Sequence, residues 1–401
     1  MRFGSFPWLP RTLVLRWGLA LAALLMAIGV AGRDVVPAWM AIQGRALISD
    51  FRHFDAMPMV RAPAASPLPR APAALNWPAA AAADPQAWLA ERGTVALLVL
   101  RRGALIHEAY FNGFERTSIG TSFSVAKSIV SALVGIALAE GHIASLDDPL
   151  TRYLPELAAT DARFSNVTLR HLLLMRSGIA FDEGYRSPLS DAARFYLSRD
   201  LAARVRALKI EGAPDRMQAY RSGDTQLLGM VLARATGLPL AKYAESRLWQ
   251  PMGAEFDASW SLDSADAGTA KAFCCVNARA VDFARFGQLF LQGGQLDGRQ
   301  IVPGPWVRES TAAAARPGGN DIQRRNIERP FSERRAFYAY QWRRAAQPGK
   351  GEPAEDFYAQ GLLGQYVYVA PATQTVLVRL GRHQGNVFWP QFLGELARLN
   401  P

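Results

Sequence analysis

The spacing of hydrophobic residues changes twice along the 401-residue chain, and each change predicts a different kind of element. Residues 93–114 (GTVALLVLRRGALIHEAYFNGF) are rich in Val, Leu, Ile and Tyr on both sides of an Arg-Gly pair, which predicts two strands joined by a turn. Strand-like segments return only near the C-terminus, at 337–344, 365–370 and 375–381. The last two flank the sequence PATQ, which is typical of a hairpin turn.

Helical spacing dominates the region between these strands. Three segments with helix start signals end at a glycine: 124–140, 168–177 and 224–236. A final helix is expected over 387–399. Strands at both ends with helices between them predict an α/β (α+β) fold, in which an antiparallel sheet built from the N- and C-terminal strands is flanked by helices. The helical middle then forms a second lobe, and a cleft between the lobes is the expected place for a site.

The first 32 residues have the pattern of a targeting segment. Three arginines precede the apolar run 17–32 (WGLALAALLMAIGVAG), and no acidic residue occurs before Asp34. This predicts a signal peptide or an N-terminal membrane anchor. The basic flank keeps its own side cytoplasmic, so we expect an exported, periplasmic domain that residues 17–32 tether to the inner membrane unless they are cleaved.

The next segment has the composition of a linker. Residues 61–85 are dominated by Ala and Pro, which favours a semi-extended chain. Residues 33–60 either pack on the folded domain or space it from the membrane. We therefore expect a linker and spacer over 33–86 and a single catalytic domain over 87–401.

The charge distribution argues against a nucleic-acid partner. The net charge is +11, but only five of the 45 basic residues are Lys, and the abundance of Arg and Ala is typical of codon usage in a GC-rich genome. No basic run is interleaved with aromatic residues, so scattered solvated charge is the interpretation. No sequence signal points to a particular oligomeric state.

The potential metal ligands lack the spacing of a metal site. His107-Glu108 is not followed by the second His of a metalloprotease motif, and the only two cysteines are adjacent. A disulfide between neighbours is strained and rare, so Cys274 and Cys275 are expected to be two small core residues even in an oxidising compartment. No metal and no other cofactor is expected.

One apolar helix carries a polar stripe. In residues 121–138 (TSFSVAKSIVSALVGIAL), Ser124, Lys127, Ser128 and Ser131 lie at i, i+3, i+4 and i+7. A buried ammonium is costly and tends to lose its proton, so Lys127 can serve as a base for Ser124 at the helix start. The alternative is the polar face of an ordinary amphipathic helix, although such a face normally carries more charge.

Several motifs, in order, resemble the serine β-lactamase and penicillin-binding superfamily, on the branch of class C β-lactamases, esterases and 6-aminohexanoate-dimer hydrolases. The resemblance extends from about residue 93 to the C-terminus. Its motifs are SFSVAKS (122–128), GHIASLDDPLTRYLPEL (141–157), VTLRHLLLMRSGI (167–179), YRSGDTQLLGMVLARATG (220–237), NARAVDFARFGQLFLQGG (277–294) and YAYQW (338–342).

The resemblance implies roles for individual residues. Ser124 corresponds to the acylated nucleophile and Lys127 to the lysine of S-x-x-K. Tyr220 corresponds to the tyrosine of Tyr-x-Asn/Ser, which accepts the serine proton and returns it to the leaving group, and Ser222 occupies the third position. Without the resemblance, Tyr220 would be a core aromatic residue, and Ser222 or Asp224 an ordinary N-cap, with Asp224 the better candidate.

The chain departs from this family at the third motif, usually Lys-Thr-Gly or His-x-Gly. Here AQGLLGQ places Ala359, Gln360 and Gly361 at that position. Ala359 supplies no cation for a substrate carboxylate, which counts against penicillin hydrolysis and favours the aminohexanoate-dimer hydrolase and esterase side. Gln360 and Gly361 are expected to bind substrate, with Gly361 allowing its close approach to the strand. The backbone N–H of Leu362, with that of Ser124, is expected to form the oxyanion hole.

The resemblance thus predicts a serine hydrolase that cleaves an amide or ester bond of a small molecule through an acyl-enzyme. Tyr185 and Glu183 are candidates for the wall of the acyl pocket. Two alternatives are a catalytically weak or inactive, membrane-tethered binding or receptor protein on the same fold, and a D-Ala-D-Ala carboxypeptidase or β-lactamase. An α/β-hydrolase is disfavoured because no G-x-S-x-G precedes a suitably placed His.

Overall fold

The computed structural model describes residues 45–65, 67–185, 187–266, 268–312, 337–346 and 353–401. The predicted targeting segment, residues 1–32, lies outside the described residues. Among the helices of the described ranges, none is long and apolar enough to cross a membrane.

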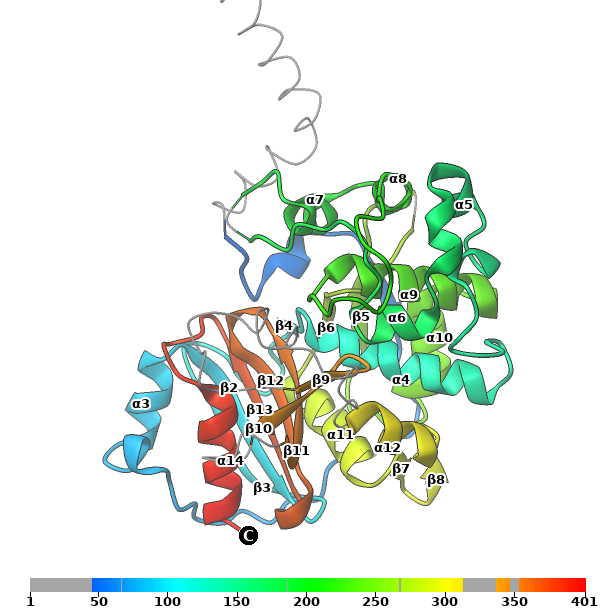
Figure 1. The fold of residues 1–401 in the computed structure, drawn as a ribbon. Coiled ribbons are helices and arrows are strands. Elements are labelled where there is room, and N and C mark those ends of the chain that lie inside the picture. Colours follow the sequence, from blue (N-terminus) through cyan, green and yellow to red (C-terminus); the bar gives the residue numbers. More distant parts are fainter. Residues whose placement is uncertain (1–44, 66, 186, 267, 313–336, 347–352) are drawn as a thin grey trace, which may run out of the picture.

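A seven-stranded antiparallel sheet combines two strands from the N-terminal part of the domain with five strands from its C-terminal part, as the sequence predicted (Figure 1). Its strand order is β3-β2-β13-β12-β11-β10-β9. The strands are β2 (Thr94–Arg101), β3 (Ala104–Tyr110), β9 (Phe337–Ala339), β10 (Trp342–Ala346), β11 (Pro353–Gly361), β12 (Gln365–Ala370) and β13 (Thr375–Gly381). The α/β (α+β) class is therefore confirmed.

The β2–β3 hairpin shows how local sequence builds this sheet. Arg102 and Gly103 both have positive φ values, 50° and 82°, as a two-residue hairpin turn requires. Strand β2 is buried between β3 and β13, and its side chains alternate between two cores. Leu97 and Val99 belong to one core, and Leu98 and Leu100 to the other.

Helices cover both faces of the sheet (Figure 1). On one face, α3 (Pro85–Glu91) and α14 (Trp389–Leu399) close the smaller core. On the other face, α11 (Ala280–Leu291) packs against β12 and β13, and α4 (Val125–Ala139) contacts β11. Helix α4 thereby connects the sheet to the helical lobe.

The helical lobe surrounds α4 and is confirmed as the middle of the chain (Figure 1). Its helices are α5 (Glu156–Thr160), α6 (Leu169–Leu173), α7 (Asp191–Leu197), α8 (Leu201–Arg206), α9 (Ser222–Thr236) and α10 (Leu240–Ala244), and α12 (Gly304–Thr311) packs on α4 from the other side. A second sheet has four strands in the order β1-β5-β6-β4: β1 (Ala56–Met59), β5 (Ala258–Ser261), β6 (Val276–Ala278) and β4 (Gly120–Thr121). Strands β7 (Gln295–Leu296) and β8 (Arg299–Gln300) form a separate small hairpin.

Two predicted elements differ from the structure by more than two residues or in number. The single strand expected at 337–344 is two strands, because Tyr340 and Gln341 form a left-handed turn with φ values of 42° and 70°. The helix expected at 168–177 ends at Leu173, and Met175 has a φ of 56°. By contrast, β12 and β13 have the predicted bounds.

The described part of the N-terminal segment lies against the domain. Strand β1 pairs with β5, so residues 56–59 pack on the domain rather than serving as a free spacer. Farther along, the Leu105 N–H donates to the Pro69 carbonyl (2.7 Å), and the Ala73 N–H donates to the Ile106 carbonyl (3.0 Å). The Ala/Pro-rich chain thus runs extended along the edge strand β3.

Candidate active site

Ser124 lies at the junction between β4 and α4. It is the residue before the first turn of α4, and it is only partly buried whereas its neighbours are buried. Phe123, directly before it, has a φ of 43°, a left-handed conformation that is costly for a non-glycine residue. Ser122 holds this turn, because its N–H donates to the Val276 carbonyl (2.8 Å) and its Oγ accepts from the Val276 N–H (3.0 Å).

Lys127 is buried one turn into α4, with its amine pointing at Ser124. The Nζ lies within hydrogen-bond distance of Ser124 Oγ (3.0 Å), Ser222 Oγ (3.1 Å) and the Phe273 carbonyl oxygen (2.8 Å). Its side chain is 1% exposed. Burial lowers the pKa of Lys127 to about 7, as the sequence predicted for a buried lysine.

A carboxylate stands behind Ser222. The Ser222 hydroxyl donates to Glu183 Oε1 (2.6 Å), and the Ser222 N–H donates to Glu183 Oε2 (2.7 Å). The Tyr185 hydroxyl donates to the same carboxylate. The sequence proposed Glu183 as part of a pocket wall, whereas its side chain anchors the start of α9 next to Lys127.

Tyr220 brings its ring to the same place. The Lys127 Nζ lies 5.0 Å from the centroid of the Tyr220 ring. Tyr338 packs edge-on against that ring, with 5.9 Å between centroids, and the Arg343 guanidinium lies 5.3 Å from it. The predicted proximity of Tyr220 to Lys127 is therefore present, and its role in proton transfer stays a prediction.

Arg343 is a residue that the sequence analysis missed. Its charge lowers the pKa of Lys127, whereas the charge of Glu183 raises it, and both effects are smaller than that of burial. Arg343 reaches Tyr220 only because the turn at residues 340–341 folds β9 back along β10. Neither turn residue is Gly or Asn, so the sequence carried no signal for this hairpin.

The end of β11 approaches the turn at residues 122–124. A Cβ on Gly361 would lie 2.3 Å from the Ser122 carbonyl oxygen and 3.1 Å from the Phe123 Cβ. The glycine was expected to admit a substrate, but what comes close is the backbone of the protein itself. Gln360 pairs with Tyr366 within the sheet, and Ala359, at the position of the missing cation, is buried in the core.

A cavity opens beside Ser124 where the sheet meets the helical lobe. Three of the predicted site residues besides Ser124 line it: Tyr185, Ser222 and Leu362. Gln360 and Gly361 are not among its lining residues. The other residues that line it are mainly apolar: Ala46, Phe123, Ala192, Ala193, Tyr196, Phe273 and Cys274.

Two predictions about this region are wrong. Asp224 is not an N-cap, because α9 begins two residues earlier, at Ser222. Its buried carboxyl accepts from the Ser177 hydroxyl (2.6 Å), and burial raises the pKa of Asp224 to about 7. Cys274 and Cys275 are buried as expected but form a disulfide. Neighbours in a strand point to opposite faces, whereas Cys275 has a φ of 76° and leaves the extended conformation just before β6.

The described residues contain no group of three or more His, Cys, Asp or Glu side chains that could hold a metal ion. The groups that the structure brings to Ser124 are the Lys127 amine, the Ser222 hydroxyl and the ring of Tyr220 beside that amine.

The chain is similar to known proteins in sequence and in fold. Residues 81–389 match the family model named Beta-lactamase. A 6-aminohexanoate-dimer hydrolase of Paenarthrobacter ureafaciens is 28% identical over 308 residues, which cover 74% of each chain. Esterase EstB of Burkholderia gladioli is 36% identical over 142 residues, covering 32% of this chain and 36% of the esterase. A solved structure from Bacillus anthracis, assigned as a 6-aminohexanoate-dimer hydrolase, superimposes with a TM-score of 0.73 at 22% identity and covers 88% of this chain and 92% of that one.

Proposed function

Because the chain belongs to the Beta-lactamase family and its curated relatives are hydrolases, we propose that it is a serine hydrolase that cleaves an amide or ester bond through an acyl-enzyme on Ser124. The observation that carries this proposal is the hydrogen bonding of Lys127. Three groups surround the amine, and they differ in whether they have a proton free to donate to it. This difference supports Ser124 as the group that donates its proton to the amine.

A neutral lysine amine has two N–H groups and one lone pair. The Phe273 carbonyl can only accept, so it takes one N–H. Ser222 gives its own proton to Glu183, so its oxygen takes the second N–H. The lone pair is then left for the Ser124 hydroxyl, 3.0 Å away, and a pKa of about 7 makes that neutral form available near neutral pH.

The reaction follows from this arrangement. Ser124 Oγ attacks the substrate carbonyl carbon while its proton passes to the Lys127 amine. The carbonyl oxygen becomes an oxyanion that the N–H groups of Ser124 and Leu362 stabilise, in keeping with the presence of both residues at one cavity. Collapse of the intermediate breaks the C–N or C–O bond, and the leaving group receives the proton from Lys127 through Tyr220. Water then attacks the acyl group, returns a proton to Ser124 and releases the carboxylic acid.

The cavity favours a neutral, apolar acyl group. Its wall beside Ser124 is built from Phe123, Phe273, Tyr196 and alanines, and none of its lining residues in the described part of the chain is Lys or Arg. A carboxylate on the acyl side would lose its hydration there without gaining a cation. This composition supports an amidase or esterase over a β-lactamase, whose acyl-enzyme keeps the substrate carboxylate. A D-Ala-D-Ala carboxypeptidase releases its carboxylate with the leaving amine, so against that alternative the support is the absence of a cation at Ala359.

Labelling with a fluorophosphonate probe tests the nucleophile. The wild type should form an adduct on Ser124, and Ser124→Ala should form none. Lys127→Ala should lower the labelling rate by about 10²–10⁴-fold, the range for loss of a general base. Tyr220→Phe should slow the hydrolysis of an amide more than that of a p-nitrophenyl ester. An amine leaving group needs the proton that Tyr220 returns, whereas p-nitrophenolate can leave without one. If no acylating probe reacts with Ser124, the alternative of a binding or receptor protein is favoured.

A substrate pair tests the acyl side. We expect p-nitrophenyl butyrate to have at least a tenfold higher kcat/KM than the p-nitrophenyl monoester of succinic acid, which has a similar length but ends in a carboxylate. Nitrocefin, D-amino-acid peptides and ω-amino-acid dimers complete the panel. Faster hydrolysis of the succinate ester would contradict the apolar acyl pocket.

We also propose that the protein is exported and tethered to the membrane by residues 17–32. The support is the basic flank and apolar run of the sequence, together with the disulfide, which is typical of oxidising compartments. Fractionation of cells that express the full-length chain, with and without residues 1–32, tests this proposal.

A further inference from the structure

We propose that the Cys274–Cys275 disulfide is a positioning device, which holds the Phe273 carbonyl against Lys127 and so sets the amine for Ser124. This inference rests on the proposed function. Cys274 directly follows the residue whose carbonyl accepts from Lys127 Nζ, and Cys274 itself lines the cavity beside Ser124. Neither cysteine has another role in the mechanism.

The disulfide closes a turn that both flanks hold in place. On its N-terminal side, the Cys274 N–H donates to the Lys271 carbonyl (3.1 Å), and Trp260 Nε1 donates to the Cys274 carbonyl (3.0 Å). On its C-terminal side, the next residue is Val276, which forms two hydrogen bonds with Ser122 in the turn before Ser124. The two cysteines thus lie in the short stretch of chain that connects the partner of Lys127 with the partner of Ser122.

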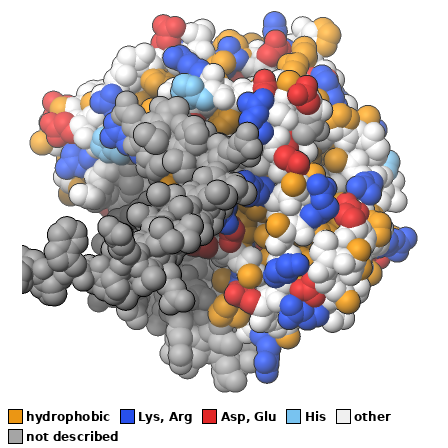
Figure 2. Space-filling view, turned by 90° about the horizontal axis from the view of Figure 1, so that it is seen from above, with side chains coloured by type: hydrophobic (Ala, Val, Ile, Leu, Met, Phe, Trp, Pro, Cys, Tyr) orange, Lys and Arg blue, Asp and Glu red, His pale blue; other side chains and the backbone are white. Residues whose placement is uncertain are grey.

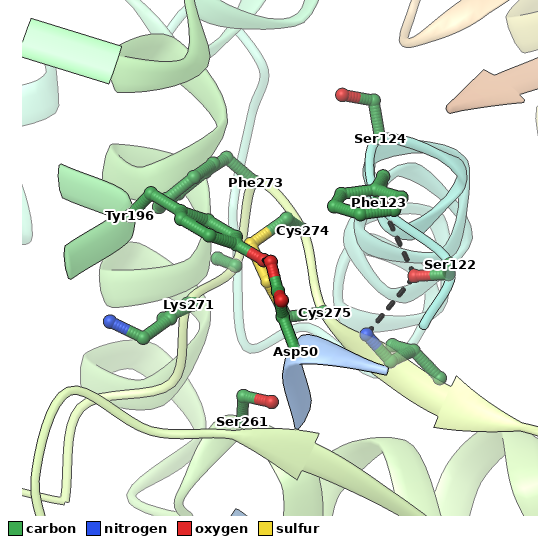
Figure 3. Close-up of a disulfide and its surroundings, with 12 residues drawn as sticks. Asp50, Ser122, Phe123, Ser124, Tyr196, Ser261, Lys271, Phe273, Cys274 and Cys275 are labelled. Atoms are coloured by element: carbon green, nitrogen blue, oxygen red, sulfur yellow. Dashed lines mark hydrogen bonds between the residues drawn. A yellow bond between two sulfur atoms is a disulfide. The ribbon is translucent and has the colours of Figure 1, made fainter. Parts of the chain in front are cut away.

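Figure 3 shows how closely these groups gather. The close-up shows the disulfide together with Phe273 and Tyr196, and both of these residues line the cavity with Cys274. The side chains of Cys274 and Cys275 are 3% and 1% exposed, so the bond belongs to the wall of the site and not to the outer surface.

The backbone of Cys275 explains why a covalent bond is needed. Its φ of 76° is a left-handed conformation that is unfavourable for a non-glycine residue. The ring formed by the disulfide excludes the relaxed conformations. With two free thiols, residue 275 can return to ordinary backbone angles, and the Phe273 carbonyl, two residues away, moves off Lys127. Opening the ring requires a dithiol reductant, which becomes a disulfide as the protein gains two thiols and the S–S bond breaks.

Two variants separate the bond from the backbone conformation. In Cys274→Ala/Cys275→Ala the bond is lost, and the left-handed backbone conformation is still unfavourable for the alanine at position 275. In Cys274→Ala/Cys275→Gly the bond is equally lost, but glycine adopts the left-handed conformation freely. The pair therefore serves as a matched comparison within the same turn.

The experiment uses the full-length protein, oxidised or treated with dithiothreitol, and both variants. Thiol counting after denaturation verifies the redox state. One readout is the fluorophosphonate labelling rate of Ser124 across pH. The other is an NMR titration of the labelled lysine amines, which is practicable because the chain has only five lysines and is independent of turnover.

We expect reduction, or the Ala/Ala variant, to lower the labelling rate roughly tenfold, since small misplacements of a catalytic group are costly. The Lys127 titration should move upward, because a loosened wall admits water to a group whose pKa is lowered mainly by burial. The Ala/Gly variant should recover most of the rate and of the wild-type midpoint.

Other results overturn the inference. Two free thiols in the protein as isolated would show that Cys274 and Cys275 do not form a disulfide. An unchanged rate and Lys127 midpoint after verified reduction would show that the bond positions nothing, and an equal loss in Ala/Gly and Ala/Ala would exclude the route through the backbone of residue 275. Failure of the proposed function is distinguishable, because it removes Ser124 labelling from the oxidised wild type while the Lys127 titration still reports on the disulfide.

Discussion

The amine of Lys127 lies between groups of opposite charge. Burial is the largest influence on its pKa and lowers it, the charge of Glu183 raises it, and that of Arg343 lowers it. A lysine at the surface would be almost fully protonated at neutral pH and unable to accept the Ser124 proton. At the residue scale, the site depends on removing water from one amine while keeping three hydrogen-bond partners around it.

The opposite signs of the two charges give a paired prediction. Because only the neutral amine can accept the Ser124 proton, the acylation rate should rise with pH through a midpoint near 7. Glu183→Gln removes a charge that favours the ammonium, so the midpoint should move to lower pH, whereas Arg343→Gln should move it to higher pH. Labelling rates from pH 5 to 10 measure both. Shifts in the same direction would mean that Lys127 is not the titrating group.

Two elements of distant sequence origin meet at Ser124, the proposed nucleophile. The β4–α4 junction supplies Ser122 to Ser124, and the end of β11 lies against it without a side chain at Gly361. Leu362 is the next residue, so this contact also sets the distance between the two N–H groups proposed for the oxyanion hole. At the element scale, therefore, the fit of one strand end against one helix start determines that geometry.

Substitution of Gly361 tests this contact. In Gly361→Ala the new Cβ would collide with the Ser122 carbonyl, a backbone atom that cannot turn aside, so β11 must shift. We expect a loss of about 1–3 kcal/mol in the free energy of unfolding and a clear fall in Ser124 labelling. Gly304→Ala at the start of α12 is the matched control, because its Cβ would make only ordinary contacts, the nearest at 3.5 Å. Equal behaviour of the two variants would contradict the steric account.

At the scale of the whole molecule, charge on the surface and charge in the core behave differently. On the face shown in Figure 2, Lys and Arg side chains are interspersed with Asp and Glu, as expected for solvated charge. In the core, a second lysine is fully buried. Lys271 Nζ donates to the Ser198 carbonyl (3.1 Å) and lies 4.7 Å from the centroid of the Phe54 ring. Burial lowers the pKa of Lys271 to about 7.

This buried lysine makes stability depend on pH with a definite sign. Between about 7 and the ordinary lysine value near 10.4, the unfolded chain binds more protons than the folded one, so the free energy of unfolding rises with pH across that window. Lys271→Met removes this contribution. The variant should gain stability over the wild type at pH 7 and lose most of that advantage by pH 9.5, as urea unfolding can measure.

Lys242→Met is the control, since that side chain is 39% exposed and its ammonium forms a salt bridge with Glu245 (3.0 Å). Its difference from the wild type should be small and independent of pH. Parallel curves for Lys271→Met and the wild type from pH 6 to 10 would show that Lys271 is not buried as a neutral amine.

Local signals in the sequence were sufficient for much of the fold. The Arg-Gly turn between β2 and β3, the glycine that ends α9 and the PATQ turn each act over a few residues, so the elements they bound could be predicted. The pairing of Ser124 with Lys127 was predictable for the same reason, because one turn of a helix separates them.

The tertiary structure alone decided the contacts that bring distant segments together. The left-handed turn at Tyr340 and Gln341 has no glycine to announce it, and it brings Arg343 to Tyr220. The Phe273 carbonyl reaches Lys127, and Gly361 reaches Ser122, across long stretches of chain. The hydrophobic pattern of a sequence determines which residues are buried and in which element. Which buried groups then touch depends on how the elements pack. Here that packing lowers the pKa of Lys127 and allows the Cys274–Cys275 disulfide to form.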